Sequence, residues 1–230
     1  MRILLGFFLF FFSAVSLSIG DNHINKGLIS STASATDKQA VFPAELKALP
    51  VNAVEIYNLA KVNKWHEIRN NFDKLKKSEQ SLKLKKNEEN DFLIQRLRKK
   101  IEELEQAISA KNRRETMRSA NKITLIAVAM IGQFKLRVPT DVMVLNYCGR
   151  EMEILSEDKD IDKLFSLVMR MHLIWQNLIP QLVNKNASKE IKNFSEIMKH
   201  LEVAKTPTEF NRLAKQVLDE VDNLEKVFTK

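Results

Sequence analysis

The sequence predicts an all-α protein, an antiparallel multi-helix bundle built around a central apolar helix. Glycine and proline are scarce, with five of each in 230 residues, and apolar residues recur at three- and four-residue spacing, which is typical of amphipathic helices. No segment alternates as a strand does. The central helix is expected within residues 120–134, because the run from Ile123 to Gly132 is apolar on every helical face, as in buried helices. The run is far shorter than the ~20 residues that cross a bilayer.

The chain divides into three parts. Residues 1–20 have the single positive charge, the apolar segment and the small residues Ser18 and Gly20 of a signal peptide with its cleavage site. A retained N-terminal anchor is the alternative, because the apolar stretch continues almost to that site. Residues 21–50 have no apolar period and are expected to form a disordered tether. Residues 51–230 are expected to form the helical bundle domain, exported to a bacterial periplasm or secreted.

Apolar periodicity predicts helices over residues 51–79, 90–108, 112–136, 141–156, 161–182, 191–201 and 207–228. Pro43 and Pro50 are expected to bracket a turn before the first helix. Thr140 is expected to cap the fourth helix, and Pro180 to kink or end the fifth. Short connections would make sequential helices neighbours. No internal repeat is visible in the sequence.

Two helix starts carry a capping pattern. Asn112 with Glu115 three residues later predicts that a new helix begins there. Without a glycine or proline to force a break, one continuous helix over residues 90–136 is the alternative. Thr206 and Glu209, on either side of a proline at the first helical position, form the clearest helix start in the chain.

The positive charge of the chain is concentrated in one third of its length. The formal net charge is +8, and residues 61–118 contain 17 lysines and arginines against 10 aspartates and glutamates. The densest stretch predicts a basic face made of Lys83, Lys85, Lys86, Arg96, Arg98, Lys99 and Lys100. Such a face suits an acidic protein, a polymer or an anionic surface. Nucleic acid is not expected, because only Phe92 could stack on bases there. An ordinary solvated helix face is the alternative.

A second candidate site is buried and polar. Glu151 falls among apolar residues of its helix, so it needs a partner such as the amide of Asn121. Glu225 repeats this pattern near the C-terminus and completes the candidate set. A structural ion pair and a proton-transfer group of an enzyme are the two interpretations. Arg150 and Glu153 are assigned to a solvent-facing stripe of the same helix.

The sequence contains none of the common catalytic, phosphate-binding or haem-attachment motifs. It predicts no metal site and no cofactor. His172 is placed on the inward face of its helix, where it could ligate haem together with a methionine, but an ordinary histidine of the core or its boundary is the alternative. Cys148 is the only cysteine and is expected to be a buried, inert thiol. An exposed thiol that pairs two chains is the other interpretation.

These patterns favour an exported, non-enzymatic helical protein that binds an acidic partner through its basic face. The alternative function is a haem or metal carrier with His172 and a methionine inside the bundle. An enzyme built on Glu151 has the least support.

Overall fold

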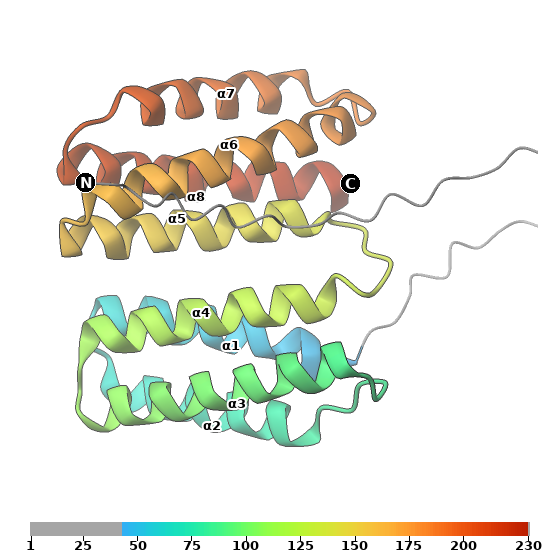
Figure 1. Ribbon diagram of the computed structural model, residues 1–230, viewed down its shortest axis with the longest axis vertical. Coiled ribbons are helices and arrows are strands. Elements are labelled where there is room, and N and C mark those ends of the chain that lie inside the picture. Colours follow the sequence, from blue (N-terminus) through green and yellow to red (C-terminus); the bar gives the residue numbers. More distant parts are fainter. Residues whose placement is uncertain (1–42, 230) are drawn as a thin grey trace, which may run out of the picture. The chain divides into compact units, whose positions relative to one another are not determined.

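The computed structural model describes residues 43–229, which fold into α-helices joined by short connections, without a strand (Figure 1). The helices are α1 (Ala44–Lys61), α2 (Trp65–Ser81), α3 (Glu88–Ser109), α4 (Arg113–Ile131), α5 (Thr140–Asp158), α6 (Ile161–Val183), α7 (Ser188–Val203) and α8 (Pro207–Thr229). The all-α bundle is therefore confirmed. The predicted signal peptide at residues 1–20 and most of the predicted tether lie outside the described residues. Within residues 43–229, no helix combines the length and the hydropathy needed to cross a membrane.

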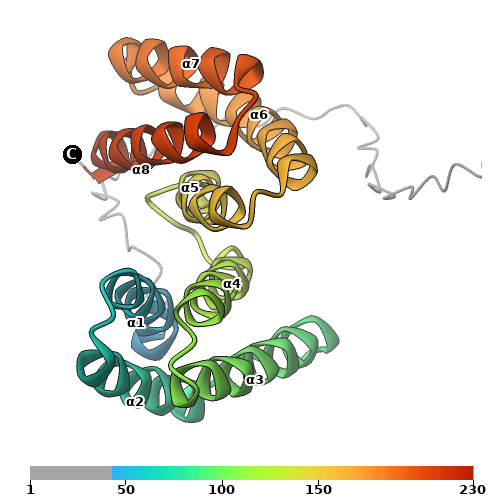
Figure 2. The same cartoon turned by 90° about the vertical axis from the view of Figure 1, so that its left-hand side faces the viewer.

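The helices form two groups of four with the same order of neighbours. In each group the first helix packs most extensively against the fourth, and also against the second, while the third packs against the fourth. The two groups, α1–α4 and α5–α8, meet where α4 lies against α5 (Figure 2). Each group has its own hydrophobic core. The repeated arrangement has no counterpart in the sequence, since helix packing requires only an apolar stripe and not particular residues.

Helix α4 is buried on several sides, as its apolar run predicts. Ile123 and Ala127 are completely buried, and α1, α3 and α5 cover the helix. Leu125 packs against the core of the second group, so that α4 contributes to both cores. Ala129 is the exception, because it is exposed within the apolar run.

The predicted helix over residues 51–79 is wrong at its start and in its middle. Helix α1 begins at Ala44, so the expected domain boundary after Pro50 is too late. Pro50 lies inside the helix, where the burial of Leu46 and Leu49 in the core offsets the hydrogen bond that a proline cannot donate. A turn then separates α1 from α2, with Asn63 in the left-handed region at φ 58°.

Two predicted helix starts are confirmed. Asn112 Oδ1 accepts a hydrogen bond from the backbone N–H of Glu115 at 3.2 Å. A turn therefore separates α3 from α4, and the single helix over residues 90–136 is wrong. At the start of α8, Thr206 Oγ1 accepts from Glu209 N at 3.3 Å, and Glu209 Oε2 accepts from Thr206 N at 2.9 Å. This is the complete reciprocal capping box.

Two finer predictions are wrong, and a third is wrong in one of its two alternatives. Helix α4 ends at Ile131 rather than near residue 136. Helix α5 begins at Thr140 itself, with Pro139 at the N-cap position and no side-chain cap hydrogen bond. Pro180 does not end α6, which continues to Val183.

Candidate functional site

The connection between α2 and α3, residues 82–87, carries the first part of the predicted basic face and is called here the lysine connector. Leu82 and Leu84 pack against the core of α1–α4, while Lys83 and Lys85 are exposed. Successive side chains of an extended chain point to opposite sides. The two leucines therefore hold the connector in place and turn its lysines toward solvent.

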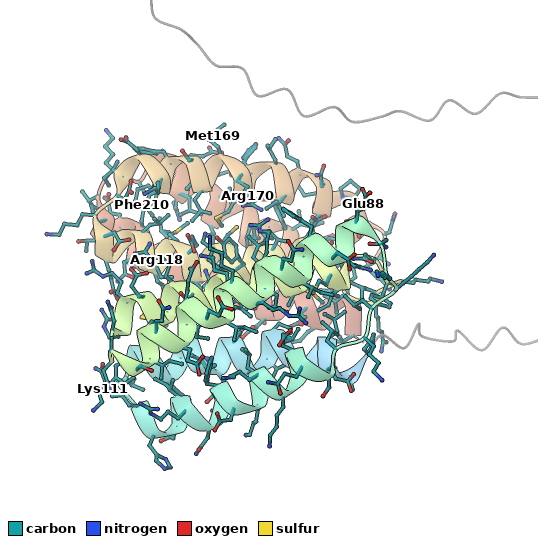
Figure 3. All side chains as sticks on the ribbon, turned by 60° about the horizontal axis from the view of Figure 1, so that its bottom comes forward. Glu88, Lys111, Arg118, Met169, Arg170 and Phe210 are labelled. Carbon is teal, nitrogen blue, oxygen red and sulfur yellow. The ribbon has the colours of Figure 1, made fainter. Side chains whose placement is uncertain are left out.

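A buried asparagine fixes the lysine connector to the rest of the first helix group. Asn90 is 2% exposed, and its Nδ2 donates to the backbone oxygen of Lys85 at 2.7 Å. Its Oδ1 accepts from Gln133 Nε2, just beyond α4, at 2.6 Å. Its backbone N–H donates to the side chain of Asn87 at 2.7 Å. The connector is thus held at the start of α3, which Glu88 marks in Figure 3.

The cations of the predicted basic face differ in their pairing. Arg98 Nε lies 2.7 Å from Glu79 Oε1, and Lys100 forms an ion pair with Glu103. Within residues 43–229, no ion pair is formed by Lys83, Lys85, Lys86, Arg96 or Lys99, all of which are exposed. The cations of this face without an ion pair therefore lie on the lysine connector and at Arg96 and Lys99 of α3, whose first turn carries three carboxylates, Glu88, Glu89 and Asp91.

Asn121 of α4 and Glu151 of α5 are both buried and in contact, as the sequence predicts. Asn121 Nδ2 donates to Glu151 Oε2 at 2.9 Å, and Lys122 Nζ donates to Glu151 Oε1 at 2.8 Å. Lys122 also donates to the hydroxyl of Tyr147. Both carboxylate oxygens are thus engaged, which favours the structural ion pair. Glu225 does not join this cluster, because it is exposed on α8.

Arg150 is buried, and its assignment to a solvent-facing stripe is wrong. It is 5% exposed. Its Nε donates to Asn121 Oδ1 at 3.0 Å, and its Nη1 donates to Asn146 Oδ1 at 2.5 Å. The guanidinium carbon lies 5.9 Å from the centre of the Tyr57 ring. Arg150 forms no ion pair with a carboxylate within the described part of the chain, so amide oxygens alone accept its hydrogen bonds.

Glu153 is also buried, at 9% exposed, and its partners come from α1. Its Oε2 accepts from the Tyr57 hydroxyl at 2.6 Å, and Lys61 Nζ donates to both carboxylate oxygens at 2.8 Å. The Tyr57 hydroxyl also lies 3.2 Å from the backbone oxygen of Arg150. These long side chains bridge α1 and α5, whose backbones do not pack against each other. Sequence reasoning missed Tyr57 and Lys61 because the bridge depends on tertiary structure.

The close approach of α8 also buries the part of α5 next to Arg150. A Cβ atom added at Gly149 would lie 2.7 Å from Leu218 Cδ2 and 3.3 Å from Val217 Cγ1. Any larger residue at this position would require the Leu218 side chain to shift. Gly149, next to Arg150 in the middle of a helix, is therefore the one sequence signal that could have indicated burial of this stretch.

Burial shifts several pKa values around α5. Burial and the neighbouring Glu153 raise the pKa of Tyr57, and burial with Glu151 raises that of Tyr147, so both phenols stay neutral. Burial lowers the pKa of Arg150 to about 10, which leaves the guanidinium charged at neutral pH. Burial raises the pKa of Cys148 to about 12. Cys148 is completely buried, which confirms that the thiol is not exposed.

A cavity of about 670 Å³ is lined by residues of α1, α2, α4, α5 and α8. It is lined by Lys47, Pro50, Val51, Asn52, Val54, Glu55, Asn71, Lys74, Thr124, Val128, Ile131, Val142, Met143, Asn146, Arg150 and Glu225. A second cavity of about 220 Å³ shares Val54, Asn146 and Arg150 with it. Arg150 therefore borders both spaces, and the larger one, called here the α1–α5 groove, has several exposed residues at its rim.

His172 does not lie in the interior. It is half-buried on α6, with Nδ1 3.2 Å from Glu202 Oε1 and Nε2 2.8 Å from Gln176 Nε2. Both ring nitrogens have partners at the surface, and the predicted inward orientation is wrong. The methionine Met171 beside it is completely buried in the core, so the two side chains do not face one space.

No protein-family model, no curated protein and no solved structure matches this chain.

Proposed function

We propose that this chain is an exported, non-enzymatic binding protein that docks on an acidic partner through the lysine connector and the exposed cations Arg96 and Lys99 of α3. The observation that carries the proposal is the set of exposed cations without ion pairs, Lys83, Lys85, Lys86, Arg96 and Lys99. The other two cations of α3, Arg98 and Lys100, are paired with carboxylates.

The lysines are held in place before any partner binds. Leu82 and Leu84 anchor the connector on the core, and Asn90 binds the backbone oxygen of Lys85. A fixed backbone lowers the entropy that is lost on binding. This arrangement favours a specific surface over an ordinary solvated loop.

The chemistry of the surface favours an acidic polypeptide or polymer. Phe92, at 57% exposed, is the one large exposed apolar side chain among the residues of this surface. Anchoring in a membrane needs a broad apolar face beside the charge, and the apolar side of α3 is buried in the core. Stacking on nucleic acid needs several aromatic side chains.

The test is binding of poly-glutamate to the wild-type protein and to the variant K83Q/K85Q/K86Q, over a series of salt concentrations. Attraction between exposed charges is screened over about 10 Å at 0.1 M salt. We expect affinity to fall steeply as salt rises, and the variant to bind at least fivefold more weakly at low salt.

The matched control is K185Q/K189Q/K192Q, which removes the same charge from three exposed lysines around the start of α7. It should bind almost as well as the wild type. Equal losses in both variants would mean that only net charge matters, and binding that is indifferent to salt would contradict the role of the lysines.

Export is supported by the composition of residues 1–20. Expression of the full chain in a bacterium, followed by fractionation and N-terminal sequencing, tests it. A periplasmic or secreted product that begins near Asp21 is expected. A cytoplasmic product that retains Met1 would contradict export.

A further inference from the structure

The guanidinium of Arg150 is a buried charge without a counter-charge in contact. Burial of an ion is costly unless it is paired. The nearest carboxylate of its own helix, Glu153, already receives hydrogen bonds from Tyr57 and Lys61. Arg150 instead donates from Nε and Nη1 to two amide oxygens, which do not neutralise its charge.

One nitrogen of Arg150 remains available to the α1–α5 groove. Nε and Nη1 donate to Asn121 and Asn146, while Nη2 makes no hydrogen bond within the described residues. Ser156 Oγ is the only fully enclosed side-chain nitrogen or oxygen without a partner in residues 43–229. Nη2 is therefore not enclosed, and Arg150 borders both the α1–α5 groove and the second cavity.

Asn146 offers a second donor one helical turn away. A guanidinium only donates hydrogen bonds, so the oxygen of the Asn146 amide must face Arg150, as it does at 2.5 Å. The amide nitrogen then faces away from Arg150, and Asn146 lines the same two cavities. The two residues present N–H donors at positions i and i+4 of α5, the chemistry that binds a carboxylate or a similar anion.

The remaining wall of the groove is mainly apolar, with Asn52, Asn71 and Thr124 as its other polar residues. Val128 and Ile131 of α4 and Val142 of α5 line it from buried positions, and Val51, Val54 and Met143 complete it. At the rim, Lys47 and Lys74 are matched by Glu55 and Glu225, all four exposed. The rim charges cancel, so Arg150 determines the sign of the interior. A volume of about 670 Å³ falls within the range of small-molecule sites.

We propose that the α1–α5 groove binds a small organic anion with one acidic group and an apolar body, the acidic group on Arg150 and Asn146. The apolar body lies against the valine and isoleucine side chains of α4 and α5. The site is separate from the lysine connector, because the two share no residue.

The experiment is calorimetric titration of the full mature chain with octanoate, with the neutral analogue 1-octanol and inorganic phosphate as comparison probes. Octanoate should bind with a stoichiometry of one. Octanol and phosphate should bind at least tenfold more weakly, because octanol lacks the acidic group and phosphate lacks the apolar body. Failure of octanoate to bind at millimolar concentration, or equal binding of either comparison probe, would overturn the proposal.

Two variants locate the site. R150Q removes the charge, and loss of a charged hydrogen bond should weaken octanoate at least tenfold. V51W fills the groove from an exposed position without altering the polar network, and should weaken octanoate by a similar factor even if R150Q fails to fold. Unchanged binding in V51W would overturn the assignment.

Two controls separate this site from charge in general and from the proposed function. R170Q removes a cation on α6 (Figure 3) that lines neither cavity. K83Q/K85Q/K86Q removes the positive charges of the lysine connector. Both should bind octanoate as the wild type does. A loss in either control equal to that in R150Q would show that net charge, and not the groove, binds the anion.

Discussion

The lysine connector and Arg150 carry positive charge under opposite conditions. The connector lysines lie in water, where each charge is solvated and needs no partner. Arg150 is 5% exposed; Asn121, Asn146 and the Tyr57 ring surround it, and the nearby Glu153 raises its pKa against the effect of burial. An exposed cation can be replaced at little expense in stability, whereas a buried one requires a supporting network. The comparison teaches that the number of cations in a stretch says less about a binding site than what surrounds each of them.

The largest effect should come from removing the centre of that network. Asn121→Leu keeps the size of the side chain but leaves both Arg150 Nε and Glu151 Oε2 without this partner. We expect the free energy of unfolding, measured in urea, to fall by about 3–5 kcal/mol. Asn211→Leu, at an exposed position of α8, should change it by less than about 0.5 kcal/mol. A loss below about 1 kcal/mol in the first variant would mean that the network is not needed.

An intermediate effect is expected where the lysine connector is fixed. Asn90→Ala removes the hydrogen bonds to Lys85 and Gln133 at a buried position, and should destabilise the protein by about 2 kcal/mol. It should also speed amide hydrogen exchange in residues 82–87. Gln133→Ala removes only one of these bonds, so its effect should be roughly half as large. Unchanged exchange in Asn90→Ala would show that the leucines alone hold the connector.

A smaller effect should appear at alkaline pH. The pKa of Cys148 is raised from 9.0 to about 12, so between these values the folded state retains a proton that the unfolded state has lost. The stabilisation is fully present below pH 9 and decreases as pH rises. Between pH 9 and pH 10 the unfolding free energy should fall by about 1 kcal/mol from this thiol. Cys148→Ala should flatten that slope, and a slope that is unchanged in this variant would assign it to other groups.

The smallest effect is expected for K83Q/K85Q/K86Q, which should change the unfolding free energy by less than about 0.5 kcal/mol. A loss above about 1 kcal/mol would show that these lysines support the fold. The contrast with Asn121→Leu is the direct measure of the difference between the two charged regions.

The sequence predicted those features that depend on local patterns. The apolar run of α4 indicated a buried helix, and the capping residues Asn112 and Thr206 marked helix starts correctly. The contact between Asn121 and Glu151 was also predicted, because a carboxylate in an apolar stretch needs a partner nearby.

Features that depend on which helices meet were not predicted. Arg150 was assigned to solvent because its own helix offers it a surface-like i, i+3 neighbour, and only the positions of α1 and α4 show its burial. Pro50 was interpreted as a turn because local rules disfavour it inside a helix, but core packing on either side retains the helix. The residues that line the α1–α5 groove extend along the sequence from Lys47 to Glu225, so no local pattern reveals the groove.

The most direct test is thermal unfolding of the wild type, R150Q and K83Q/K85Q/K86Q, each measured with octanoate and with poly-glutamate. Octanoate at about ten times its dissociation constant should stabilise the wild type and K83Q/K85Q/K86Q by about 1.4 kcal/mol, and R150Q by no more than about 0.4 kcal/mol. Poly-glutamate at low salt should stabilise the wild type and R150Q to the same extent, and K83Q/K85Q/K86Q less. Stabilisation of R150Q by octanoate to the same extent as the wild type, or loss of both responses in one variant, would contradict the claim that the exposed lysines and the buried arginine are separate binding sites.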